Sequence, residues 1–258
     1  MRSIIINADD YGLSSGVCAS IIELLQRDAI SNTTIMICVE NAYEHCRKLC
    51  EENLAHRAGV HLQTTPEEYH RHPLSPPEEI PTLVDSSGQF KPQDHTDWIN
   101  PEEIEIEWER QIVKVMEALE RKPSHLDSHH GVHRKTELTP IYLKLAKKYK
   151  IPVRGGRALN QIDGKPYGVA SSAIAFSDWT GQNKDINELK QIILESLEQV
   201  EEGIPELVVH PGFCDEELIA SSTWNSVREN DHNVLLALSE EKWLEQNNIT
   251  LSCYPKIT

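Results

Sequence analysis

IIINADD, residues 4–10, is the stretch from which the fold of this chain can be predicted. A short run of β-branched residues followed by turn-forming residues is typical of a buried strand. Asp9 and Asp10 end the stretch, and two adjacent carboxylates repel each other unless a cation or a proton relieves the repulsion. Active sites of parallel α/β folds lie at the carboxyl ends of their strands. The stretch therefore predicts such a fold with a metal site at the end of its first strand.

Outward from residue 10, strand-like and helix-like patterns alternate along the chain. Strands that alternate with helices indicate βαβ units and a parallel sheet. About seven strands in a chain of this length favour an irregular (β/α) barrel of the α/β class. The expected strands are residues 3–7, 34–39, 58–62, 125–128, 151–154, 170–176, 207–210 and 250–253. The expected helices are residues 14–27, 43–52, 100–121, 139–149, 187–203 and 233–246.

Residues 63–100 interrupt this alternation with a long irregular stretch. A loop of this length inside a domain is more often functional than a linker. We expect it to form a lid or a wall over the site, with a plain surface excursion as the alternative. Residues 1–258 are expected to form a single domain that carries this loop as an insertion.

Composition limits the possible partners. The 258 residues carry a formal net charge of −16, which argues against nucleic acid or an anionic membrane as a partner. No apolar stretch reaches the roughly 20 residues that span a bilayer, and the first residues do not resemble a signal peptide. We therefore expect a cytoplasmic protein. The sequence has neither a GxGxxG motif nor a P-loop, so nucleotide binding has no support.

Polar residues gather at the predicted strand ends. Each has a plain structural explanation: the aspartates can cap a helix, a single histidine can be hydrogen-bonded in the core, and an arginine can pair with an acid. Their shared position at carboxyl ends favours one common site instead. The residues are Asp9, Asp10, His61, His125, His129, His130, His133, Arg154 and His210.

Metal-ligand chemistry then suggests the first set of roles. One carboxylate and two neutral imidazoles form a facial ligand set that leaves positions open for water and a substrate oxygen. Asp10, His61 and His125 can supply this set. Because the end of the fourth strand is uncertain by a few residues, His129 or His130 is the alternative to His125.

Acid–base chemistry assigns two further residues. A bound metal lowers the pKa of its water and polarises a carbonyl. Asp9 is then available as the general base. His210, which arrives from another strand, suits the acid that protonates the leaving group. Metal, base and acid together predict hydrolysis of an amide or an ester.

Five short motifs resemble the YdjC-like carbohydrate deacetylases, which include the chitooligosaccharide (diacetylchitobiose) deacetylases. They are NADD at 7–10, GVH at 59–61, SHLDSHHGVH at 124–133, PVR at 152–154 and HPG at 210–212. The resemblance implies an irregular barrel like that of polysaccharide deacetylases. It also implies removal of an N-acetyl group from a GlcNAc-containing oligosaccharide, with or without a phosphate, and commonly a homodimer.

The resemblance also implies a cofactor and roles for site residues. It implies one divalent ion, usually magnesium, held by Asp10, His61 and His125, with Asp9 as base and His210 as acid. The ligand chemistry itself suits zinc, cobalt or nickel better, because magnesium prefers oxygen ligands.

Substrate contacts rest on less specific signals. Arg154, His129 and His130 are predicted to bind substrate or support the site. Flat aromatic rings suit the apolar faces of sugars, so four tryptophans are candidates: Trp98, Trp108, Trp179 and Trp224. A phosphate on the sugar would require further basic residues, for which Arg157 and Lys165 are candidates.

Two other functions compete with deacetylation. Another metal-dependent barrel hydrolase, such as a phosphoesterase, would need more carboxylate ligands than the motifs supply. A non-catalytic sugar-binding protein would need neither Asp9 nor His210.

Overall fold

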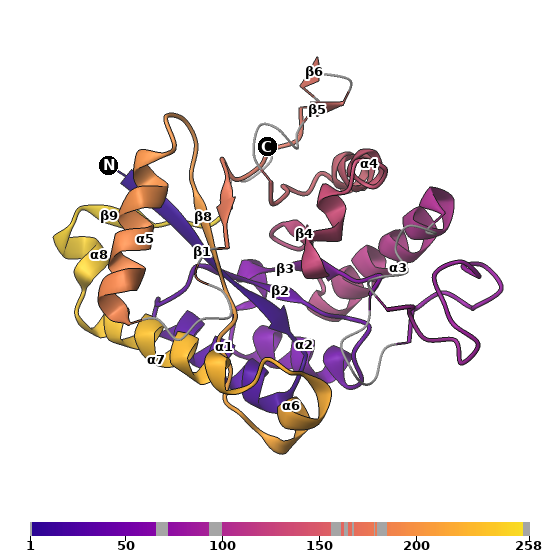
Figure 1. The fold of residues 1–258 in the computed structure, drawn as a ribbon, viewed down its shortest axis with the longest axis horizontal. Helices are drawn as coiled ribbons and strands as arrows, with labels where there is room; N and C mark the ends of the chain where they lie inside the picture. Colours follow the sequence, from indigo (N-terminus) through magenta and orange to yellow (C-terminus); the bar gives the residue numbers. More distant parts are fainter. Residues whose placement is uncertain are drawn as a thin grey trace.

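A curled parallel sheet forms the centre of the protein (Figure 1). The computed structural model describes residues 2–65, 72–92, 100–155, 161–162, 165–166, 168–177, 179 and 185–254. The strand order is β4-β3-β2-β1-β8-β7, with β9 beside the start of β1, and every pairing is parallel. The strands are β1 (Arg2–Tyr11), β2 (Asn32–Ile35), β3 (Ala58–Leu62), β4 (Leu126–Ser128), β7 (Ala175–Phe176), β8 (Glu206–Val209) and β9 (Ile249–Leu251).

Single-residue bridges continue the pairing beyond β4. Val153 pairs with Leu126 on one side and with Ser171 on the other. A few residues later in the same segment, the carbonyl of Ile174 accepts a hydrogen bond of 2.8 Å from the backbone N–H of Glu206 in β8. The pairing therefore curls back toward β8, and the predicted irregular barrel of about seven parallel strands is confirmed.

β1 lies in the middle of the sheet because its sequence is apolar on both faces. Ile4, Ile5 and Ile6 are all completely buried, as is usual for a central strand of a parallel sheet. β1 pairs with β2 on one side and β8 on the other, and its carboxyl end carries Asp9 and Asp10. The first strand thus places both carboxylates at the carboxyl edge of the sheet.

Helices cover the outside of the sheet (Figure 1). The predicted start of α3 is confirmed, because the Asn100 side chain accepts a hydrogen bond from the backbone N–H of Glu102, and Pro101 is the first helical residue. None of the helices in the described part of the chain is long and apolar enough to cross a membrane. The α-helices are α1 (Ser15–Gln26), α2 (Ala42–Glu51), α3 (Pro101–Leu119), α4 (Thr139–Tyr149), α5 (Ile186–Glu198), α6 (Glu216–Ser221), α7 (Ser226–Glu240) and α8 (Trp243–Gln246). The 3₁₀ helices are η1 (Ala55–Arg57) and η3 (His129–Arg134).

Several predicted boundaries were wrong. The helix expected at 233–246 is two helices, α7 and α8, because Lys242 adopts a left-handed conformation with φ of 51° and ends the regular turn. The helix expected at 187–203 ends at Glu198. The strand expected at 151–154 is reduced to the bridge at Val153. A small antiparallel hairpin, β5 (Gln161–Ile162) with β6 (Lys165–Pro166), was not predicted.

The described part of the long loop packs against α3. Buried Glu107 accepts hydrogen bonds from the backbone N–H groups of Leu74 (3.0 Å) and Ser75 (2.9 Å). Glu103 accepts one from Thr82 in the same way (2.8 Å). Residues 72–92 are therefore a packed segment, and none of them lines the pocket described below. Residues 66–71 and 93–99, on which the lid prediction also depends, lie outside the described residues.

Candidate active site

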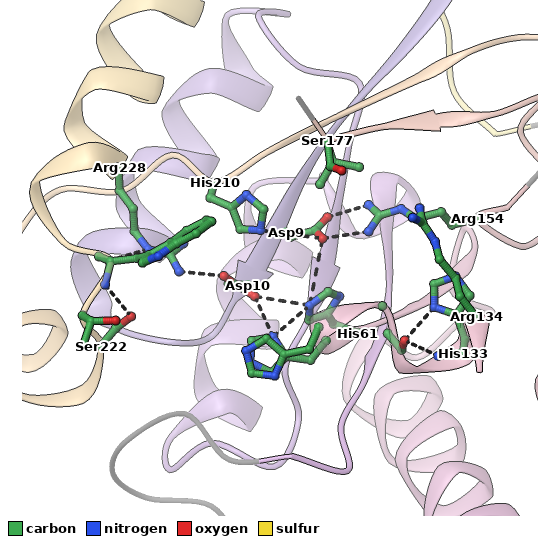
Figure 2. A pocket seen from close by; sticks show the side chains of 17 residues that line it. Asp9, Asp10, His61, His133, Arg134, Arg154, Ser177, His210, Ser222 and Arg228 are labelled. Carbon is green, nitrogen blue, oxygen red and sulfur yellow. Dashed lines mark hydrogen bonds and ion pairs between the residues drawn. The ribbon is translucent and has the colours of Figure 1, made fainter. Parts of the chain in front are cut away.

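A pocket of about 410 Å³ opens at the carboxyl ends of the strands (Figure 2). It contains both aspartates from the end of β1, His61 from β3, and His210 from the end of β8. The structure therefore brings together most of the residues predicted from sequence. The remaining lining residues are Ser128, His129, His130, Gly131, His133, Arg134, Arg154, Ser177, Val208, Ser222, Thr223, Trp224 and Arg228.

Three ligand-type atoms converge at the floor of the pocket. Oδ1 of Asp10 lies 3.2 Å from Nε2 of His61 and 3.4 Å from Nδ1 of His129. The two ring nitrogens are 3.3 Å apart. Two metal–ligand bonds of about 2.1 Å at a tetrahedral angle put the ligand atoms about 3.4 Å apart. These three buried residues thus fit a divalent cation.

Asp127 orients His61 toward this cluster. Its Oδ1 lies 2.6 Å from Nδ1 of His61, so Nδ1 carries a proton and Nε2 is the ring nitrogen that faces the cluster. Burial by itself would lower the pKa of His61, but Asp127 and Asp9 raise it to about 10. The site thus favours positive charge at His61, which either a proton or a metal ion can supply. Asp127 was missed in the sequence, although it lies inside the 124–133 motif; the parallel register of β3 and β4 sets it opposite His61.

His125 does not lie with the other two predicted ligands. It precedes β4, at the amino end, and is absent from both groups of potential ligands found among the described residues. Its ring stacks on Tyr254 with centroids 3.8 Å apart, and its Nδ1 lies 2.8 Å from the hydroxyl of Ser124. Three residues of strand span about 10 Å, so His125 lies well below the edge where the ligands meet. The group of potential ligands in the structure contains the alternative residue, His129, in place of His125.

Asp9 is held by a guanidinium. Arg154 binds both of its oxygens, with Nη1 to Oδ2 at 2.7 Å and Nη2 to Oδ1 at 2.6 Å. Burial would raise the pKa of Asp9, but Arg154 lowers it well below its usual range. Arg154 also contacts Asp127 (2.9 Å) and Glu206 (2.7 Å). The second group of potential ligands, Asp9 with His61 and Asp127, therefore already has a cation between its carboxylates.

His210 faces Asp9 across the pocket. Its Nε2 lies 4.0 Å from Oδ2 of Asp9. Burial lowers the pKa of His210 to about 4, so the ring is neutral at neutral pH. Its backbone N–H donates a 2.9 Å hydrogen bond to Asp231, and its ring meets the edge of Trp224 at 5.4 Å between centroids.

Arg228 is a second site residue that the sequence did not reveal. Its Nη2 lies 2.7 Å from Oδ2 of Asp10. Burial would raise the pKa of Asp10, but Arg228 lowers it well below its usual range. Arg228 stands 218 positions from Asp10 in the chain, and no local pattern marks it. Only the folded chain brings the two together.

The other predicted substrate contacts separate into two groups. His130 and Trp224 line the pocket, where Trp224 is 39% exposed and His130 Nδ1 lies 2.9 Å from the Thr65 hydroxyl. Trp108 and Trp179 are completely buried, so they are unavailable to a sugar. Trp98, Arg157 and the Lys165 side chain lie outside the described residues.

The fold and the side-chain cluster define the class: a curled parallel α/β barrel with a candidate single-metal centre at its strand ends. The family model described as "YdjC-like protein" matches residues 3–246, and the chain belongs to this family.

Relatives and solved structures agree with this assignment. A protein of Enterococcus faecalis named "Carbohydrate deacetylase" is 31% identical over 266 residues, covering 99% of this chain and 98% of its own length. A crystal structure from Enterococcus faecalis, provisionally described as a cellobiose-phosphate cleavage protein, is 29% identical with a TM-score of 0.87, covering 98% of this chain and 97% of its own. A family 4 carbohydrate esterase from Streptomyces lividans shares the fold, with a TM-score of 0.52 at 11% identity and coverage of 100% and 93%.

Proposed function

We propose that this protein removes the acetyl group from an N-acetylglucosamine unit of a short oligosaccharide by metal-dependent hydrolysis, releasing acetate. The observation that carries the proposal is the convergence of Asp10, His61 and His129 in the same pocket as Asp9 and His210. The chain is a hydrolase of the carbohydrate deacetylase class, because it belongs to this family and matches relatives of that name over nearly its whole length.

Asp10, His61 and His129 are the residues that would hold the divalent ion, one per chain. When bound, the ion would lower the pKa of a water molecule and polarise the acetyl carbonyl. Two imidazoles and one carboxylate favour zinc, cobalt or nickel, whereas the family resemblance implies magnesium. Asp127 would fix the ring of His61 for this task by holding its Nδ1 proton.

Asp9 is the proposed general base. Arg154 keeps the carboxylate ionised and fixes its plane, so a proton acceptor is always in place at the pocket wall. Because its pKa is lowered, Asp9 readily releases a proton that it has accepted. The proton taken from the attacking water must therefore pass on quickly.

His210 is the proposed acid and the next carrier of the proton. Because its pKa is lowered to about 4, the ring does not hold a proton before the reaction at neutral pH. The proton that it donates to the leaving nitrogen must then arrive during turnover, and Asp9 lies 4.0 Å away. In this scheme one proton moves from water to Asp9, then to His210, then to the amine as the C–N bond breaks.

The pocket walls suit a sugar. The half-exposed indole of Trp224 offers a flat apolar surface beside His210. Exposed Arg134 lines the same pocket and offers a guanidinium fork to a phosphate. We therefore propose diacetylchitobiose, with or without a phosphate, as the substrate to test first. On resemblance alone we also propose a homodimer that acts on products of chitin degradation.

The competing functions fit the site less well. A phosphoesterase with two metals would need a second ligand cluster, and the second one found in the described part of the chain is already occupied by Arg154. A non-catalytic sugar-binding protein would have no use for Asp9 and His210 facing each other across the pocket.

The test is acetate release from N,N′-diacetylchitobiose and from its 6-phosphate. The metal-stripped full chain is assayed with magnesium, zinc, cobalt or nickel added back in turn. Acetate that appears only with an added ion would support the proposal and identify both the preferred ion and sugar. No acetate with any ion would overturn it, and phosphoesters would be assayed next.

A further inference from the structure

Arg228 links two halves of the pocket that lie far apart in the sequence. It is buried on α7, with 1% of its surface exposed. Its Nη2 donates to Oδ2 of Asp10 (2.7 Å), and its Nε donates to the backbone carbonyl of Trp224 (2.8 Å). Its own carbonyl accepts a hydrogen bond from the backbone N–H of Gly212 (3.1 Å), two residues after His210. The Arg228 side chain thus contacts a proposed metal ligand (Figure 2) and the segment that carries Trp224, and its backbone carbonyl contacts the segment that carries His210.

We propose that Arg228 is a positioning residue that fixes the orientation of Asp10 as a metal ligand and ties it to the His210 side of the pocket. This inference rests on the metal-dependent function proposed above. Nothing in the sequence motifs assigns a role to this arginine.

Arg228 could simply neutralise the charge of Asp10, but the contacts of the two aspartates point to a positioning role as well. Asp9 has both oxygens bound by the Arg154 guanidinium, which takes the place of a metal ion beside it. Asp10 has only Oδ2 bound by Arg228, and Oδ1 faces His61 and His129. A single contact on the outer oxygen fixes the plane of the carboxylate while leaving the inner oxygen for a metal. The two arginines therefore give adjacent, chemically identical residues different tasks.

Gly212 provides a second, independent observation that supports the positioning role of Arg228. A Cβ atom at Gly212 would lie 2.8 Å from Cγ2 of Val17 and 3.3 Å from Cδ of Arg228. Any larger residue there would have to displace α1 or the arginine side chain. The glycine of the HPG motif thus leaves room for Arg228 to reach Asp10.

The experiment titrates the metal-free full chain with cobalt(II) and records affinity and the visible absorption spectrum, which reports the ligand geometry. Arg228→Met is expected to weaken cobalt binding about 10- to 100-fold, the usual effect of losing a contact that orients a ligand, and to change the spectrum. Arg228→Lys keeps the charge with one donor group, so an intermediate loss is expected. Gly212→Ala should weaken binding in the same direction without touching any ligand.

Arg57→Met is the matched control. Arg57 is also buried, but its guanidinium binds backbone carbonyls, including those of Ser31 (2.7 Å) and Leu25 (2.8 Å), and it does not line the pocket. It should lower the melting temperature and leave cobalt affinity unchanged, which separates loss of stability from loss of positioning.

The outcomes are distinguishable. Unchanged or tighter cobalt binding in folded Arg228→Met would overturn the inference, because tighter binding means that Arg228 only offsets the charge of Asp10. If Arg228→Met does not fold, Arg228→Lys and Gly212→Ala decide, and wild-type affinity in both would overturn it. Failure of the wild-type chain to bind any ion would refute the proposed function instead.

Discussion

Asp9 and Asp10 differ in role because of their neighbours. Both are buried carboxylates at the end of one strand. Asp10 has a φ of 69°, in the left-handed region, so its side chain leaves the chain in a different direction from that of Asp9. One then meets Arg154 and the other meets Arg228 and two histidines. At the scale of the residue, two chemically identical side chains thus have different surroundings, which suit Asp9 to the proposed role of base and Asp10 to that of metal ligand.

The first prediction at this scale concerns the base. Asp9→Asn removes the proton acceptor and keeps the shape, so acetate release should fall by about 10²- to 10⁴-fold. Cobalt binding should persist, because the three proposed ligands stay in place. Turnover at the wild-type rate, measured with the same ion and sugar, would disprove the role of Asp9.

A second prediction separates His129 from His125. His129→Ala removes a proposed ligand. Cobalt affinity should therefore fall by more than the roughly 10- to 100-fold expected when a residue that only orients a ligand is lost. His125→Asn keeps a polar atom near Ser124, and cobalt affinity should stay within a fewfold of wild type. Equilibrium titration of both variants decides, and the reverse pattern would restore the ligand set expected from the sequence.

At the scale of the element, α7 supports both halves of the pocket from a single helical turn. Arg228 and Asp231 are three residues apart and therefore lie on the same face of the helix. Arg228 holds Asp10, while Asp231 accepts hydrogen bonds from the backbone N–H of His210 and from Nε1 of Trp179 (2.8 Å). The helix thus sets the spacing between Asp10, a proposed metal ligand, and His210, the proposed acid.

This arrangement predicts that turnover can be lowered without weakening metal binding. In Asp231→Asn, an amide N–H₂ group faces one of the two donors, the backbone N–H of His210 or Nε1 of Trp179. Because two donors cannot bond to each other, the segment carrying His210 should shift. A displacement of about 1 Å can lower turnover by up to about 100-fold, and we expect kcat for acetate release to fall by 10- to 100-fold. Cobalt affinity should be unchanged, since Asp231 does not contact Asp10; a parallel loss of affinity would contradict this division.

At the scale of the whole molecule, buried histidines should control stability against pH. Burial lowers the pKa of His125 and His133 well below the usual 6.5, so the folded chain excludes protons that the unfolded chain binds. Their contribution is present above pH 6.5 and is lost as the pH falls, by up to about 1.4 kcal/mol per pH unit for each group. The pKa of His61 is raised to about 10, so its contribution has the opposite sign and is lost as the pH rises from 6.5 toward 10.

The metal-free protein should therefore have its highest melting temperature near neutral pH and lose stability on both sides. Thermal unfolding followed by circular dichroism across this range measures the curve. His125→Asn should flatten the acidic side only, because His61 is unchanged. If the melting temperature of this variant falls as steeply with acid pH as that of the wild type, groups other than His125 control stability in acid.

The order of strands and helices could be predicted because it depends on local patterns. The β-branched run of β1 and the Asn100-Pro101 start of α3 are both determined within a few residues. The end of α7 could not be predicted, because the apolar pattern continues past Lys242 and only the left-handed turn there separates the helices. The short strands beyond β4 also depend on pairing partners distant in the chain.

The sequence by itself determined the class of fold, the strand ends where the site lies, and the identities of Asp9, Asp10, His61, Arg154 and His210 as its members. These follow from residue type and from position after apolar runs, which are local properties. Only the tertiary structure decided that His129 and not His125 lies beside Asp10 and His61, and that Asp127 and Arg228 contact these residues. The reason is physical: three atoms within 3.4 Å of one another depend on strand register and helix packing, which no stretch of sequence contains on its own.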